Sequence, residues 1–115
     1  LQCILNIRIS EPDSVANART EPPKYSQTEE YKGTVKVVFD PPCNTNGPFK
    51  HYAIRYNGTR TNLPIVDETI TTTATEEEVY LLPERNYSFT VTVVTENFTS
   101  LPVDIPSIQS QAGGE

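Results

Sequence analysis

Large apolar and small polar residues alternate most regularly near the C-terminal third of the chain. Tyr87, Phe89, Val91 and Val93 are large, and the residues between them are serine or threonine. A period of two is typical of a β-strand with one buried face, and aromatic and β-branched side chains suit a pleated, half-buried surface. The pattern therefore predicts that this stretch is the central strand of the fold.

Shorter stretches of the same kind occur along the rest of the chain. The segments that we expect to be strands are Leu1–Ile9, Thr34–Asp40, His51–Asn57, short edge strands between Arg60 and Thr75, Val79–Leu81 and Leu101–Ile108. Pro102 and Pro106 place the last of them at a sheet edge, because proline cannot donate a ladder hydrogen bond. Asn57-Gly58 is a signal for a tight turn after the third segment.

One long segment lacks any sustained period. Ser10–Lys32 is polar and contains Pro12 and Pro22-Pro23, so we expect a long loop with at most a short strand near Val15. Its small apolar content predicts mobility between Lys24 and Glu30. The alternative is that its tyrosines pin it across a sheet edge, where its glutamates would favour a basic partner.

Composition and charge narrow the classes of protein. The chain has 115 residues, enough for one core. The net charge of −6 argues against nucleic acid or an anionic membrane as a partner, and no apolar run is long enough to cross a bilayer. We expect one domain over residues 1–110, with an insertion at about 10–32, and a linker over 111–115.

Three motifs occur in an order that resembles fibronectin type III domains. Phe39-x-Pro41-Pro42 looks like the end of their strand B, and Phe49-x-x-Tyr52-x-Ile54-x-Tyr56 is similar to their strand C. Leu81-x-Pro83-x-x-x-Tyr87 resembles their E–F corner, in which the tyrosine hydroxyl bonds to nearby backbone. The resemblance implies an all-β, immunoglobulin-like antiparallel sandwich of about seven strands.

The sequence departs from that family at two places. Phe39 stands where the family usually has tryptophan, which keeps a large aromatic in the core. We expect Phe39 to pack beside Tyr52 or Ile54 and Val91. The segment between the first two strands is also longer than usual, which leaves the path of the first thirty residues open.

The resemblance also implies a disulfide. Cys3 and Cys43 are the only cysteines, and in this fold the start of strand A and the loop after strand B lie at the same pole. A Cys3–Cys43 bond would stabilise the fold by roughly 4 kcal/mol. The alternative is two free thiols in a cytosolic protein.

Three sequons for N-linked glycosylation begin at Asn57, Asn86 and Asn97. Together with the expected disulfide, they favour a secreted or cell-surface origin. Asn86 precedes the inward Tyr87, so it should face solvent.

No constellation in the sequence predicts catalysis, a metal or a cofactor. His51 is the only histidine and begins a strand, which favours a solvated strand end over a catalytic base. Glu76-Glu77-Glu78 could attract calcium or a basic partner, but calcium usually needs carboxylates from several segments. A solvated acidic edge is the better interpretation.

The sequence therefore predicts a non-catalytic extracellular module of a cell-surface receptor or adhesion protein. It would recognise a protein ligand or neighbouring repeats, or act as a spacer, and the sequons and the lack of Trp favour a receptor-type tyrosine phosphatase ectodomain. The alternative is an accessory module of a secreted enzyme that binds carbohydrate through exposed aromatics. The aromatics that could be exposed are Tyr25, Tyr31, Tyr80 and Phe98.

Overall fold

The computed structural model describes residues 11–25, 33–60, 62, 64–83 and 85–110. This part of the chain contains strands and no helix. The strands are β1 (Ala16–Thr20), β2 (Lys24–Tyr25), β3 (Gly33–Asp40), β4 (Phe49–Thr59), β5 (Val66–Thr72), β6 (Glu76–Leu81), β7 (Asn86–Thr95) and β8 (Val103–Gln109). Because the described residues contain no helix, none of them forms a helix that could cross a membrane.

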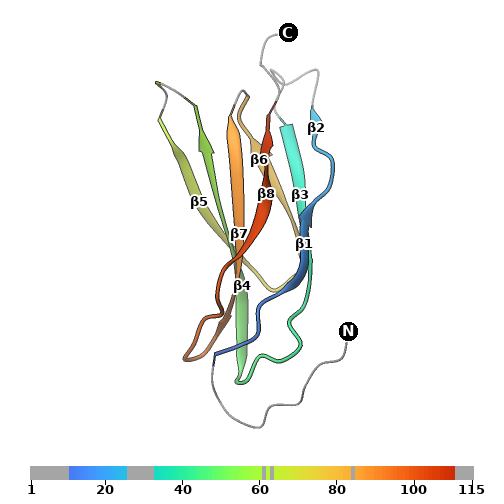
Figure 1. Ribbon diagram of the computed structural model, residues 1–115, viewed down its shortest axis with the longest axis vertical. Coiled ribbons are helices and arrows are strands. Elements are labelled where there is room, and N and C mark those ends of the chain that lie inside the picture. Colours follow the sequence, from blue (N-terminus) through green and yellow to red (C-terminus); the bar gives the residue numbers. More distant parts are fainter. Residues whose placement is uncertain (1–10, 26–32, 61, 63, 84, 111–115) are drawn as a thin grey trace.

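The strands form two antiparallel sheets that face each other (Figure 1). One sheet has the order β5-β4-β7-β8, and in the other β3 pairs with β1, β2 and β6. The predicted all-β sandwich is confirmed, with eight strands in place of about seven.

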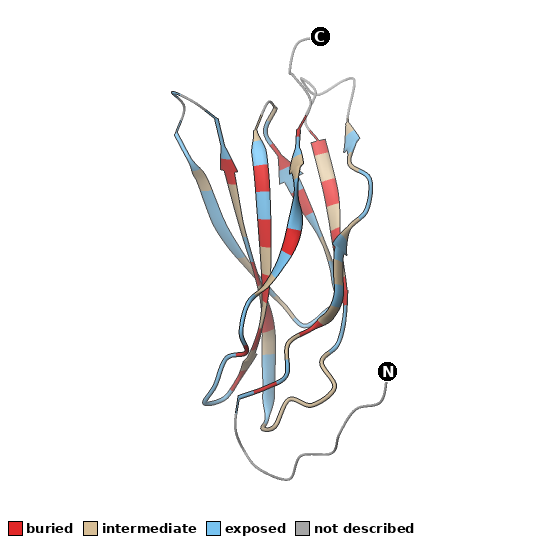
Figure 2. Cartoon of the chain, viewed as in Figure 1, coloured by how far each residue is buried: buried red, intermediate tan, exposed pale blue. Residues whose placement is uncertain are grey.

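The core lies between the sheets and follows the predicted alternation. Tyr87, Phe89, Val91 and Val93 are at most 1% exposed, and buried and paler residues alternate along β7 in Figure 2. Because β7 pairs with β4 on one side and β8 on the other, it lies in the interior of its sheet, and its buried face points toward the other sheet. The predicted central strand is therefore confirmed.

Phe39 occupies the position that the sequence predicted. It is 1% exposed, and its ring meets Tyr52 edge-on with centroids 4.8 Å apart, an arrangement that aromatic pairs favour. Phenylalanine therefore fills this part of the core.

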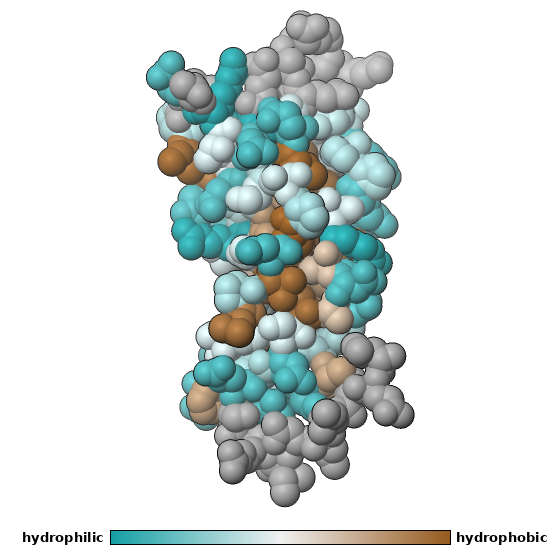
Figure 3. Space-filling view, in the orientation of Figure 1, coloured by the Kyte–Doolittle hydropathy of each residue, from teal (hydrophilic) through white to brown (hydrophobic). Residues whose placement is uncertain are grey.

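Apolar side chains also reach the side of the sandwich where β1 and β8 lie next to each other. Figure 3 shows them between these two strands. Ala18 of β1 and Val103 and Ile108 of β8 are partly buried hydrophobic residues packed against the core. The two sheets thus share apolar contacts along this side as well as in the middle.

The predicted short strand near Val15 is present as β1, and the predicted loop before β3 is wrong at Lys24 and Tyr25, which form β2. β1 and β2 both pair with β3. They share one edge of it, because β6 occupies the other edge from Gly33 to Val38. Pro22 and Pro23 interrupt the edge strand between β1 and β2, since proline cannot donate to a ladder, and the piece after them, β2, is too short to show a period of two.

Val15, just before β1, and Tyr25, in β2, pack against the rest of the domain. Val15 is 5% exposed. The ring of Tyr25 covers Gly33 so closely that a β-carbon at position 33 would lie 2.7 Å from it. Lys24 and Tyr25, the first residues of the stretch expected to be mobile, form β2, and the mobility itself stays a prediction. Tyr31, residues 26–30 and the strand expected over Leu1–Ile9 lie outside the described residues.

The predicted turn at Asn57-Gly58 is also wrong. β4 continues to Thr59, with Gly58 paired to Val66 on one side and Tyr87 on the other. Glycine is needed here because the ring of Tyr87 lies against it, and not because a turn requires it. The predictions of an edge strand between Arg60 and Thr75 and of a last strand at a sheet edge are confirmed by β5 and β8.

Candidate functional site

The outward surface of β3 and β6 carries a compact set of charged and aromatic groups, which we call the β3–β6 face. The outward positions pair as Thr34 with Tyr80, Lys36 with Glu78, and Val38 with Glu76. Strand alternation places them there, because Val35, Val37, Val79 and Leu81 point into the core.

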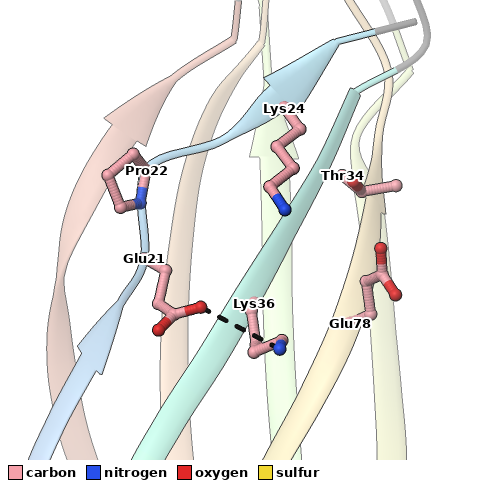
Figure 4. A pocket seen from close by; sticks show the side chains of 6 residues that line it. All are labelled: Glu21, Pro22, Lys24, Thr34, Lys36 and Glu78. Carbon is pink, nitrogen blue, oxygen red and sulfur yellow. Dashed lines mark ion pairs between the residues drawn. The ribbon is translucent and has the colours of Figure 1, made fainter.

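A shallow hollow lies on this face beside the edge strand. It is lined by Glu21, Pro22, Lys24, Thr34, Lys36 and Glu78. Figure 4 shows the two lysines pointing into it from β2 and β3. The kink at Pro22 opens the hollow, since it carries the chain from β1 to β2 around it.

Lys36 is shared between two carboxylates. Its Nζ lies 4.0 Å from Oε1 of Glu21 and 3.6 Å from Oε2 of Glu76. All three side chains are between 43% and 58% exposed, and exposed ion pairs of this kind stabilise a fold little. These three side chains can therefore leave their present ion pairs and bind charges of a partner protein at a small cost in stability.

Tyr80 is the most exposed large hydrophobic residue of the described chain, at 75%. It lies at one end of the hollow, next to Thr34. Exposed tyrosines bordered by charged groups are frequent anchors of protein interfaces, because the ring is large and its hydroxyl remains polar. The β3–β6 face thus has the chemistry of a protein-binding surface.

The acidic run of β6 is divided between the two sides of the strand. Glu76 and Glu78 are exposed on the β3–β6 face, whereas Glu77 is half-buried on the other side of the strand. No cluster of metal-binding side chains occurs among the described residues. His51 is half-buried at the start of β4, in register with Val94.

The E–F corner has the geometry that the motif predicts. The backbone N–H of Leu82 donates to the hydroxyl of Tyr87 at 2.7 Å, and Leu81 and Tyr87 are buried. Pro83 lies in the connection between them, where the side chain of Arg85 donates to its carbonyl.

Ser110 completes this corner, and the sequence analysis missed it. Its hydroxyl donates to the carbonyl of Leu82 at 2.7 Å and accepts from the backbone N–H of Arg85 at 2.8 Å. A lone serine near the chain end gives no sequence signal for such a role.

The three sequons lie at different depths in the fold. Asn86 is exposed at the start of β7, and Asn97 is exposed on the bend after β7. Asn57 is half-buried inside β4, between β5 and β7. The outward orientation expected for Asn86 is confirmed, and the occupancy of all three stays a prediction.

Cys43 is half-buried in the loop between β3 and β4. The described part of the chain contains no free cysteine. Cys3 lies outside the described residues, so the Cys3–Cys43 pairing stays a prediction.

The aromatics proposed for a sugar site do not share one surface. Tyr80 is on the β3–β6 face, whereas Phe98 is 37% exposed in the loop after β7, at the opposite end of the sandwich (Figure 1). Tyr25 is half-buried over Gly33. Nothing in this arrangement favours the carbohydrate-binding alternative.

The comparisons with known proteins agree with the topology. The sequence profile of the family described as fibronectin type III domain matches residues 20–106. No curated protein sequence matches the chain.

Several solved structures share the fold at low identity. The fourth FNIII domain of a human protein is 15% identical, with a TM-score of 0.66 over 92% of this chain and 84% of that chain. Domains d3-d4 of the rat CD45 extracellular region are 17% identical, with a TM-score of 0.63 over 89% of this chain. The chain spans 51% of that structure. The FN5 domain of Drosophila Lar is 15% identical, with a TM-score of 0.57 over 89% of this chain and 99% of that chain.

Proposed function

The chain belongs to the fibronectin type III domain family, and from this premise we propose that it is an extracellular recognition module of a cell-surface receptor or adhesion protein. Domains of this family are generally non-catalytic. The proposed partner is a protein, and the proposed binding surface is the β3–β6 face.

The exposure of Tyr80 carries this proposal. At 75% exposure its ring offers area that a partner can bury. Lys24 and Lys36 on one side and Glu78 on the other can pair with charges of a partner. Interfaces concentrate their binding energy in a few residues of this type, surrounded by polar groups.

The parent protein is proposed at two levels. The broader level, a cell-surface ectodomain, is supported by the three sequons and by the similarity to a domain pair from the rat CD45 extracellular region. The narrower level is a receptor-type tyrosine phosphatase, supported by the sequons and by Phe39 in place of tryptophan. The sequence that flanks this segment in its full-length protein tests the narrower level.

Binding to intact cells tests the proposed surface. The chain would be biotinylated, assembled into tetramers and applied to a panel of human cell lines before and after mild surface proteolysis. We expect protease-sensitive binding that Tyr80→Ala weakens by about tenfold or more, which corresponds to at least about 1.4 kcal/mol.

Thr90→Ala is the matched control, because Thr90 lies on the outward side of the other sheet. Equal binding by wild type and Tyr80→Ala would show that the β3–β6 face is not the binding surface. No binding to any cell line would favour a spacer role instead.

A further inference from the structure

Two of the three sequons are paired with each other across β4 and β7. Asn57 is in register with Ser88, and Thr59 with Asn86. The antiparallel ladder thus aligns the asparagine of each sequon with the hydroxyl residue of the other.

The middle residues of these sequons fix that alignment. Gly58 and Tyr87 are in register and both are buried. A β-carbon at position 58 would lie 2.7 Å from Cε1 of Tyr87, so the ring occupies the space that any other side chain would need. A shift by one residue would remove this fit and turn Tyr87 toward solvent.

The asparagines consequently emerge on one outward surface. Successive residues of a strand point to opposite faces. Since Gly58 and Tyr87 point inward, Asn57 and Asn86 both point outward from adjacent strands. They are diagonal neighbours on adjacent strands, and residues in such positions are about 7–8 Å apart. This spacing leaves room for the first sugars of two glycans side by side.

The surroundings of the pair are small and polar. Ser88 is exposed and Thr90 half-buried along β7. Asp67, which is in register with Asn57 on β5, has its two carboxylate oxygens 3.1 and 2.9 Å from Nε and Nη2 of Arg55. The first sugar of a glycan on Asn57 would therefore lie near hydroxyl groups and near the carboxylate of Asp67, whose charge is paired with Arg55.

We propose that Asn57 and Asn86 form one paired N-glycosylation site, filled before β4 and β7 come together. This inference rests on the proposed extracellular function. In the modification, Nδ2 of asparagine forms a bond to C1 of the first sugar of a lipid-linked oligosaccharide diphosphate. The C1–O bond breaks, the lipid diphosphate leaves with its electron pair, and the amide loses one proton.

The order of events follows from the position of Asn57. In the folded chain its backbone is enclosed between Asp67 and Ser88, so it cannot leave the sheet to enter the active site of a transferase. In the unfolded chain this restraint is absent. Asn97, on an exposed bend outside the strands, keeps its access in both states.

The paired site also assigns roles to the two sheets. Its glycans would cover the outward side of β4 and β7. They would leave uncovered the β3–β6 face, which belongs to the other sheet. The paired site and the proposed binding surface are therefore compatible in one molecule.

Secretion of the full chain from mammalian cells behind an added signal peptide tests occupancy. Glycopeptide mass spectrometry should find glycans on Asn57 and Asn86 of the same molecules as the major form. Asn57→Gln and Ser88→Ala should each remove one glycan, and Asn97→Gln is the control that leaves the pair intact. An unoccupied Asn57 in secreted, glycosylated chain would overturn the proposal.

An acceptor assay with oligosaccharyltransferase and a lipid-linked oligosaccharide tests the timing. Folded chain made in bacteria and short peptides containing each sequon would serve as acceptors. We expect the peptides to be modified at Asn57 and Asn86, and the folded chain to be modified at Asn97 but not at Asn57. Modification of the folded chain at Asn57 would contradict the timing. Because secretion is imposed by the added signal peptide, these results are independent of the cell-binding test of the proposed function.

Discussion

The ring of Tyr87 lies directly against the backbone of Gly58 in the neighbouring strand. A β-carbon at position 58 would come within 2.7–3.2 Å of three ring atoms of Tyr87. This contact explains why β4 contains a glycine in its interior, and it locks the register between β4 and β7.

Gly58→Ala should therefore destabilise the domain by about 1–3 kcal/mol, because the added methyl group must displace a fully buried ring. Urea melts followed by circular dichroism would measure the free energy of unfolding. Thr59→Ala, at an exposed position of the same strand, should change it by less than about 0.5 kcal/mol. An unchanged free energy in Gly58→Ala would show that the ring is not held against position 58.

Tyr87→Phe should cost about 1–3 kcal/mol. The substitution keeps the buried ring but removes the hydroxyl that accepts the N–H of Leu82 at 2.7 Å. The matched control is Tyr80→Phe, at a position that is 75% exposed. Equal stability of the two variants in urea melts would mean that the corner hydrogen bond contributes nothing.

Alkaline pH should weaken the fold. Burial raises the pKa of Tyr52, Tyr56 and Tyr87 above the ordinary value of 10.0. A tyrosine whose pKa is higher in the folded state than in the unfolded state stabilises the fold fully below about pH 10. This stabilisation is lost as the pH rises through the raised pKa. Urea melts at about pH 8 and about pH 11 would measure it, and Tyr87→Phe should show a smaller loss between them.

Phe39→Ala should cost about 3–5 kcal/mol, because the ring is fully buried and packs edge-on against Tyr52. Tyr80→Ala removes a ring at an exposed position and should cost less than about 0.5 kcal/mol. A loss under about 1 kcal/mol for Phe39→Ala by urea melt would argue against the observed packing.

The Arg55–Asp67 pair makes a prediction at acidic pH. Hydrogen bonds from Arg55 hold the pKa of Asp67 below its ordinary value of 3.8. The stabilisation of the fold by this ion pair is thus present at pH values above the ordinary pKa of Asp67, and it is lost as the pH falls through the lowered pKa. NMR titration of the Asp67 carboxyl group should show its pKa rising in Arg55→Gln, and an unchanged pKa would exclude this cause.

The Cys3–Cys43 disulfide can be tested directly. Alkylation of the unreduced chain followed by intact-mass analysis should show no modified thiol, and alkylation after reduction should show two. Two alkylated thiols without reduction would exclude the bond.

The sequence alone determined the sandwich and most of its core. Period-two alternation placed Tyr87, Phe89, Val91 and Val93 inward, since side chains of a strand that covers a core must alternate. Leu81, Pro83 and Tyr87 predicted the corner, because a turn before a strand depends on residues close together in the chain.

Tertiary contacts decided the features that local patterns described wrongly. Asn57-Gly58 has the sequence of a turn, but the ring of Tyr87, brought beside it by the β4–β7 ladder, makes it strand interior. Lys24 and Tyr25 have no visible period, yet they pair with the free edge of β3. In both cases the stabilising partner is distant in the chain, so no window of neighbouring residues contains the cause.

The candidate binding surface and the paired sequons have the same origin. The sequence shows where Lys36, Tyr80, Asn57 and Asn86 stand along their strands, and alternation gives the face of each. Only strand register decides that Lys36 is paired in the ladder with Glu78 and that the sequons at Asn57 and Asn86 lie opposite one another. Register is set by packing between strands, and that packing exists only once the two sheets have closed on a common core.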